Sequence, residues 1–155
     1  MREILFRGKA NSEIREGEWV YGSLLAETGN TFPIIARDYD NDEDWLGVDL
    51  WDTVEPHTVG QYTGVTDKNG NKIFEGDIIS IMFEIDGVDG VSSYSWYESA
   101  EVVFSKEKHA WVIVFNDDGE EMYLNEFDDV DDVYVIGNIY DEPKSWMGDE
   151  VCEID

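Results

Sequence analysis

Apolar and polar residues alternate over short runs along most of this chain. From residue 59 to residue 64, Val, Gln and Thr alternate with Gly, Tyr and Gly. A period of two places successive side chains on opposite faces of a β-strand. No ten-residue window shows the 3.6-residue period of an amphipathic helix, and turn signals recur about every 8–12 residues. The pattern predicts an all-β protein of the sandwich or barrel type.

The stretch from residue 58 to residue 79 carries the clearest succession of strand and turn signals. Asn69 and Gly70 separate two β-type runs, and both residue types tolerate a positive φ. This dipeptide predicts a β-hairpin with a type I′ turn, in which both central residues have a positive φ. Residues 72–74 are expected to form the returning strand.

A second turn is expected at Glu75, Gly76 and Asp77. Glycine adopts backbone conformations that other residues avoid, and the Asp77 carboxylate is expected to accept hydrogen bonds from neighbouring backbone amides. The following residues, Ile78 to Phe83, are nearly all apolar and predict a strand that is largely buried. A paired-carboxylate site at Glu75 and Asp77 is the alternative, but a turn accounts for the Gly-Asp pair.

Further β-forming runs lie on both sides of this stretch. Pro33 places the run at 31–36 toward the edge of a sheet, because proline has no N–H to donate. Residues 38–44 are predicted to form an acidic loop and residues 84–95, rich in Gly and Ser, a flexible loop. Gly137 marks a bulge in the last strand. The other predicted strands are 3–7, 18–25, 45–51, 96–104, 110–115, 122–124 and 133–140.

The composition is that of a folded chain with two small modules. Of the 155 residues, 42% are apolar and 14% are aromatic, which is enough to build a core. A change in composition near residue 66 predicts one β module over residues 1–65, a second over 66–142 and a tail over 143–155. A Gly-Asp turn before an apolar strand also occurs in small SH3-like barrels. By that fold-level analogy we expect an SH3-like barrel in the C-terminal part.

Several sites and locations are disfavoured by the sequence. No apolar run approaches the roughly 20 residues of a membrane helix, and the first residues do not form a secretory signal, so we expect a cytoplasmic protein. The single cysteine, Cys152, excludes an internal disulfide and a cysteine-based zinc cage. His57 and His109 do not have metal-type spacing, and no nucleotide-binding fingerprint occurs. We therefore expect neither a cofactor nor a catalytic residue.

The net charge of −27 is the outstanding property of the sequence. Residues 1–37 are neutral, whereas the segments 38–66 and 109–143 contain no Lys or Arg. Such a field opposes direct binding to nucleic acid or to an anionic membrane, because both need basic residues. The many Trp and Tyr residues are therefore expected in cores and interfaces rather than under stacked bases. The charge favours a basic protein partner, or solubility alone.

The aspartates at alternate positions from 38 to 44 resemble the start of a calcium-binding loop. Such a loop also needs Gly at its sixth position and Glu at its twelfth, where this chain has Glu43 and Asp49. A solvated acidic loop is therefore favoured. A weak cation site is the alternative.

Three parts of the sequence together resemble the YopX family of phage and prophage proteins. They are Phe-Arg-Gly-Lys at 6–9 with Gly-Glu-Trp-Val-Tyr-Gly at 17–22, the stretch 58–79, and Val-Ile-Gly-Asn-Ile-Tyr at 135–140. The resemblance spans nearly the whole chain, and its middle block is the most specific. It implies a small all-β phage protein with a partly open C-terminal barrel. The family has no assigned activity, so the resemblance supplies no catalytic residues.

These observations favour a non-enzymatic phage accessory protein that binds another protein through an acidic surface. One hypothesis is that it imitates DNA: a duplex about 40 Å long carries roughly 23 charges, comparable to −27. Exposed strand edges also favour a homo-oligomer. The alternative function is a metal-dependent hydrolase that uses clustered carboxylates. The residues of the candidate acidic surface are Asp38, Asp40, Asp42, Glu43, Asp44, Asp117, Asp118, Asp128, Asp129, Asp131 and Asp132.

Overall fold

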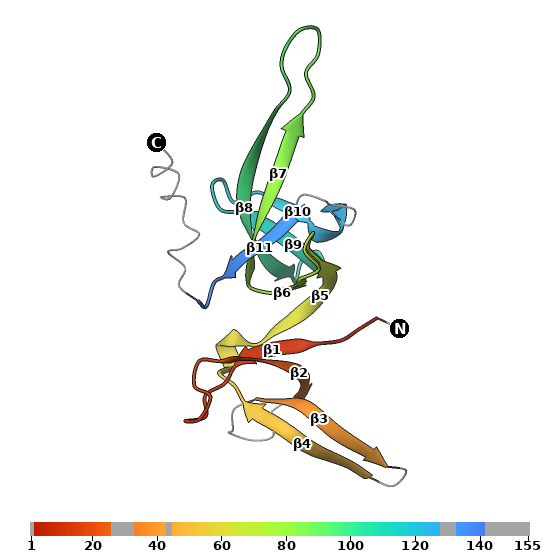
Figure 1. The fold of residues 1–155 in the computed structure, drawn as a ribbon, viewed down its shortest axis with the longest axis vertical. Helices are drawn as coiled ribbons and strands as arrows, with labels where there is room; N and C mark the ends of the chain where they lie inside the picture. Colours follow the sequence, from red (N-terminus) through yellow and green to blue (C-terminus); the bar gives the residue numbers. More distant parts are fainter. Residues whose placement is uncertain (1, 26–32, 43–44, 128–132, 142–155) are drawn as a thin grey trace. The chain divides into compact units, whose positions relative to one another are not determined.

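The computed structural model describes residues 2–25, 33–42, 45–127 and 133–141 (Figure 1). The chain divides into two compact units, Met1–Gly64 and Val65–Asp155. Every regular element in the described ranges is a β-strand, apart from two single turns of 3₁₀ helix. The prediction of an all-β protein is therefore confirmed.

The first sheet is antiparallel in the strand pairs that have a defined register. Its strand order is β4-β3-β2-β1-β5-β6. A 3₁₀ turn, η1 (Pro56–Thr58), connects β4 to β5. The strands of this sheet are β1 (Phe6–Lys9), β2 (Trp19–Leu25), β3 (Ile34–Asp42), β4 (Trp45–Thr53), β5 (Gly60–Thr66) and β6 (Lys72–Phe74).

The core of the first unit is small and lies beside two basic side chains. Ala10, Val20, Ile35 and Val54 are buried together. Asp52 is also buried, and its carboxylate lies 3.1 Å from the Arg37 guanidinium and 3.9 Å from that of Arg15. A buried carboxylate needs such partners to offset its loss of hydration.

Two predictions about this sheet are wrong. Residues 38–42 of the predicted acidic loop are strand instead, because β3 continues to Asp42 and pairs with β4 from Trp45, whereas residues 43–44 lie outside the described residues. The third strand is also not at an edge, since β3 lies between β2 and β4. Pro33 precedes the strand, where the missing N–H costs no ladder bond, and its carbonyl accepts a hydrogen bond from Val54 N.

The second unit contains a five-stranded antiparallel sheet in the order β10-β9-β8-β7-β11. The described strands do not close this sheet, so the SH3-like barrel stays a prediction. The register shifts between Val135 and Gly137, which confirms the bulge. A 3₁₀ turn, η2 (Leu124–Phe127), follows β10. The strands are β7 (Asp77–Ile85), β8 (Tyr94–Ser105), β9 (Ala110–Phe115), β10 (Glu121–Tyr123) and β11 (Val133–Asn138).

The core of the second unit follows from the period of two. Ile79 and Ile81 on β7 share a face with Ala100 and Val102 on β8, and all four are fully buried. Ile113 on β9 completes the centre of this cluster. Alternate residues of the same strands face the other way, and two of them, Ile78 and Val112, are also buried.

The Gly-Asp turn into β7 has the predicted chemistry. Gly76 has a φ of +87°, and Asp77 is buried while its carboxylate accepts a hydrogen bond from Phe74 N at 2.7 Å. A Cβ atom at Gly76 would lie 2.9 Å from the ring of Tyr140. This position therefore needs glycine both for its φ and for space.

The turn between β5 and β6 differs from the prediction. Gly70 has a φ of +82°, but Asn69 is not among the described residues with a positive φ. Gly70 N donates to Asp67 O, and Asp67 N donates to Asn71 O, so the loop is longer than two residues. A type I turn followed by a left-handed glycine is the usual form of such a loop. The Asp67 carboxylate inside the loop makes this form favourable.

Candidate functional site

Most of the predicted acidic surface lies outside the part of the chain that the structure describes. Asp38, Asp40 and Asp42 are placed by their backbone on β3, but their side chains are outside the description. The residues wholly outside the described ranges are Glu43, Asp44, Asp128, Asp129, Asp131 and Asp132. Whether the acidic segments converge on one face therefore stays a prediction.

The two described members, Asp117 and Asp118, lie in the turn after β9. The Asp117 carboxylate accepts a hydrogen bond from Asp118 N at 2.8 Å, and the Asp118 carboxylate accepts one from Glu120 N at 2.8 Å. Both residues are exposed. They stabilise the turn with one oxygen each, and the charges remain in solvent.

The most distinctive feature of the second unit is a two-stranded arm formed by the ends of β7 and β8 (Figure 1). Among the described residues, β11 pairs with β7 as far as Ile81, and β9 pairs with β8 from Ala100 onward. Beyond these points, residues 82–85 pair with residues 94–97. The loop predicted at 84–95 is therefore shorter than expected, and both of its ends are strand.

The tip of the arm is a tight turn. Asp89 and Gly90 have φ values of +50° and +87°, and Val91 N donates a hydrogen bond to Val88 O at 3.1 Å. Two central residues with positive φ are the mark of a type I′ turn. The turn type predicted at Asn69 and Gly70 occurs here instead.

An apolar face runs from the core onto the arm. Phe83 packs against the core, its ring centroid 6.0 Å from that of Phe115, and it stacks on Trp96 with the centroids 5.6 Å apart. Ile85 and Tyr94 form the next cross-strand pair on the same face. The ring centroids of Tyr94 and Trp96 are 5.7 Å apart. Here the burial ends, because Ile85 is 47% exposed and Tyr94 60%.

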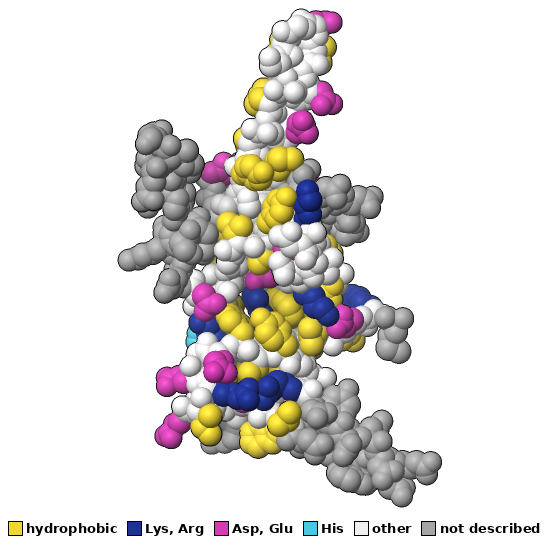
Figure 2. Space-filling view, in the orientation of Figure 1, with side chains coloured by type: hydrophobic (Ala, Val, Ile, Leu, Met, Phe, Trp, Pro, Cys, Tyr) yellow, Lys and Arg dark blue, Asp and Glu magenta, His cyan; other side chains and the backbone are white. Residues whose placement is uncertain are grey.

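The arm presents apolar and acidic side chains together (Figure 2). Val88 and Val91 near the tip are each about two-thirds exposed, at 66% and 68%. The acids Glu84 and Asp86 lie between them and the base, Asp89 lies in the tip turn, and all three are exposed. The sequence from residue 73 to residue 105 contains no Lys or Arg. Exposed apolar residues in such a group are typical of interaction surfaces.

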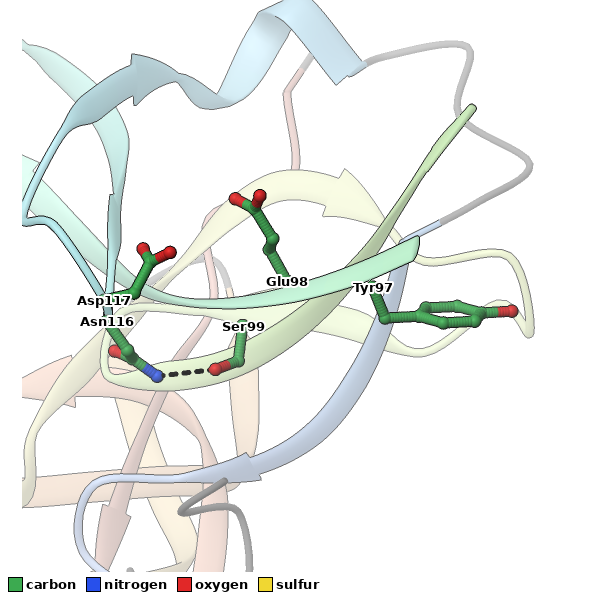
Figure 3. Close-up of a pocket in the computed structure, with 5 residues that line it drawn as sticks. All are labelled: Tyr97, Glu98, Ser99, Asn116 and Asp117. Carbon is green, nitrogen blue, oxygen red and sulfur yellow. Dashed lines mark hydrogen bonds between the residues drawn. The ribbon is translucent and has the colours of Figure 1, made fainter. Parts of the chain in front are cut away.

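A shallow hollow of ≈ 330 Å³ lies at the base of the arm, where β9 ends (Figure 3). Asn116 donates a hydrogen bond to the Ser99 hydroxyl at 2.8 Å, and this pair forms one wall. The carboxylates of Glu98 and Asp117 point to one side of the sheet, whereas Tyr97 points away from both. Tyr97 is 61% exposed. The hollow thus combines two carboxylates with the start of the aromatic arm.

A second hollow, of ≈ 250 Å³, lies beside the Gly-Asp turn. It is lined by Glu75, Glu101, Lys106 and Tyr140, among others. Burial raises the pKa of the Glu75 and Glu101 carboxyls, because the charged form loses hydration. Of the two acids weighed as a paired site, only Glu75 lines this hollow, and Asp77 is used within the turn.

Comparison with known proteins identifies a family and a similar fold. The family described as YopX protein matches residues 6–145, nearly the whole chain. The chain belongs to the YopX family. Its fold is similar to the crystal structure of protein EF1440 from Enterococcus faecalis, with a TM-score of 0.60 and 21% sequence identity, covering 95% of this chain and 100% of that chain. At this identity the similarity shows the fold alone. No protein with a curated description matches the chain.

The residues of the arm were missed as candidate site residues in this YopX protein. The three serines and two glycines between 84 and 95 favoured a loop. The available signal was the alternation of Ile81, Phe83 and Ile85, which continues the buried face of β7 beyond the predicted strand end. The Asp-Gly pair at 89–90 was a second signal, because that dipeptide favours a type I′ hairpin.

The described residues of this YopX protein contain no helix that is long and apolar enough to cross a bilayer. They also contain no group of three or more His, Cys, Asp or Glu side chains arranged to hold a metal ion.

Proposed function

We propose that this YopX protein is a non-enzymatic accessory protein of a phage or prophage that binds a basic partner protein through the β7–β8 arm. The observation that supports the proposal is the apolar face of the arm. It begins in the core at Phe83 and ends in solvent at Ile85 and Tyr94. A hairpin that exposes such residues leaves apolar surface to be buried by a partner.

The charge around the arm selects the chemistry of the partner. The exposed acids and the absence of Lys and Arg from residues 73–105 favour an apolar groove with Lys and Arg at its rim. Such a partner would associate faster at low salt, because opposite charges steer the encounter. The acidic surface predicted from the sequence would extend the same field.

Site-specific photo-crosslinking tests the proposal. A photoreactive amino acid replaces Val88 at the arm tip, and a second variant carries it at Ile14, which is 91% exposed in the first unit. In a lysate of the host cell, the Val88 variant is expected to capture a basic protein, and mass spectrometry identifies it. Capture falls at 0.5 M NaCl, because salt screens the charges. Equal capture by the two variants contradicts the proposal.

The captured partner also tests the DNA-mimic hypothesis. If the partner binds DNA, a competition experiment shows whether duplex DNA displaces the YopX protein from it. Competition supports mimicry, since both ligands would then use the same basic surface. If the partner binds duplex DNA and the YopX protein at the same time, the DNA-mimic hypothesis is wrong, but the proposal of protein binding is unaffected.

A further inference from the structure

The outer edge of β8 carries backbone groups that no described strand satisfies. Ser99 O accepts a hydrogen bond from Asn116 N at 3.1 Å, so the backbone groups of Ser99 face the side of β9. In an antiparallel strand every second residue directs its N–H and C=O to the same side. The N–H and C=O groups of Ser95 and Tyr97 therefore face outward, whereas those of Trp96 and Glu98 face β7.

The hollow in Figure 3 lies where β9 would continue if it were longer. β9 ends at Phe115, and the chain turns away at Asn116 and Asp117. Beyond this turn, among the described residues, β8 has a neighbour only on the side of β7. The site of a further strand is thus bounded by Asn116 at one end and runs along the arm.

We propose that an extended segment of a partner protein, with Lys or Arg at alternate positions, adds to the edge of β8 along residues 95–97 and places a basic side chain between Glu98 and Asp117. Addition of a strand to an exposed edge is an established mode of peptide recognition, in which main-chain hydrogen bonds supply affinity and side-chain pockets supply specificity. The inference rests on the proposed function and specifies its contact.

The charges decide between a basic peptide and a second copy of this chain. Glu84, Asp86, Asp89 and Glu98 lie on or beside the arm, and Asp117 lies at its base. Pairing of two arms would bring these acids together with no Lys or Arg from residues 73–105 to offset them. Like charges across an interface disfavour association, whereas a basic segment is attracted.

Amide hydrogen exchange, measured residue by residue by NMR on the full chain, tests the geometry. The probe is a ten-residue peptide of alternating Lys and Val with blocked ends. In the free protein, the Ser95 and Tyr97 amides are expected to exchange quickly and the Trp96 and Glu98 amides slowly. With the peptide at about ten times its dissociation constant, exchange at Ser95 and Tyr97 slows by roughly tenfold. Protection at Met82 and Glu84 instead, on the opposite edge of the arm, overturns the inference.

A peptide of the same sequence with every backbone amide N-methylated separates strand addition from simple charge attraction. It keeps all side chains and charges but has no N–H to donate. We expect its affinity to fall by about tenfold or more, since a net hydrogen bond contributes about 1 kcal/mol and two are lost. Equal affinity for the two peptides overturns the inference.

A proline substitution gives a matched pair of variants. S95P removes an N–H that faces outward, which an edge strand tolerates, whereas S95A keeps that N–H. Binding of the Lys-Val peptide is expected to weaken about fivefold in S95P, which loses one hydrogen bond, and to stay within twofold in S95A. Retained slow exchange at Trp96 and Glu98 shows that the arm of S95P is folded. Equal binding by S95P and S95A overturns the inference.

Two outcomes separate this inference from the proposed function. The first outcome concerns the variant with the photoreactive residue at position 88. If it captures a partner, and captures it equally well when it also carries S95P, the arm binds by its side chains and strand addition is wrong. If neither Val88 nor the β8 edge shows a contact, the proposed function fails as well. A dimer in sedimentation, with Ser95 protected in the absence of peptide, identifies a second copy as the occupant and overturns the basic-segment inference.

Discussion

Asp67 is the residue whose local chemistry has the largest consequence for the second unit. Its buried carboxylate accepts hydrogen bonds from Asn69 N at 2.9 Å, Asn71 N at 2.8 Å, the Asn71 amide group at 3.2 Å and Val135 N at 3.0 Å. It thereby connects the β5–β6 turn to β11. Burial raises the pKa of Asp67, but these hydrogen bonds outweigh burial and leave the pKa below its usual 3.8.

Substitution of Asp67 is expected to change the dependence of stability on pH. Because the folded pKa lies below the unfolded value, the stabilisation is complete above about pH 4 and is lost as pH falls through the folded pKa. D67N should lower the free energy of unfolding at pH 7 by about 1–3 kcal/mol, since the amide cannot accept all four bonds. Urea unfolding at pH 7 and pH 2 measures this, with the exposed D86N as control. A deficit of equal size at both pH values contradicts the prediction.

At the scale of the element, the arm is one hairpin whose base contributes to the stability of the fold and whose outer part contributes little. Its base is anchored by Phe83, which packs on the core and stacks on Trp96. Beyond Phe83 the same face is exposed at Ile85 and Tyr94. The register of the whole hairpin is set at the base, and the outer part adds little burial. The arm can therefore bind a partner without loss of the fold.

Two alanine substitutions on the same face of β7 distinguish these parts. F83A is expected to lower the free energy of unfolding by about 1–3 kcal/mol, because it removes a partly buried aromatic ring from the core. I85A should change it by less than about 0.5 kcal/mol, because that side chain is largely in solvent. Chemical denaturation of both variants checks the difference. A loss in I85A as large as in F83A would show that the outer arm packs on the molecule.

At the scale of the whole molecule, the net charge of −27 opposes the compact state. Most of the acidic side chains cannot each pair with a Lys or Arg, because the chain has 37 acidic and only 10 basic side chains. The few basic residues are used locally, as where Arg37 lies 3.1 Å from the buried Asp52. Repulsion among the remaining carboxylates is therefore relieved mainly by water and salt.

The stability of the whole chain is expected to rise with ionic strength. The urea midpoint should increase between 10 mM and 0.5 M NaCl, because the Debye length falls from about 30 Å to less than 8 Å. MgCl₂ at equal ionic strength is the control for a specific cation site. If micromolar Mg²⁺ raises the urea midpoint and binds with a defined stoichiometry, the metal-dependent hydrolase is favoured over the binding protein. A midpoint that falls with NaCl would show that screening is not the dominant effect.

The all-β class, the bulge at Gly137 and the turn at Gly76 and Asp77 could be predicted because each depends on neighbours in the sequence. A period of two, a glycine at a positive φ and an Asp beside free backbone amides are short-range signals. The family could also be recognised, since its blocks span the chain. The acidic surface stays a prediction, because most of its residues lie outside the described ranges.

The placement of strands within each sheet depended on contacts distant in sequence. Pro33 was expected to mark an edge, yet β3 is interior because pairing with β2 and β4 begins after the proline. Asn69 was expected at a positive φ, but the Asp67 carboxylate and its bond to Val135 N favour a longer loop. The sequence by itself determined the β period, the turns and the charge. The tertiary structure decided which edges are unpaired, because an edge is defined by the absence of a partner strand and not by the strand's own residues.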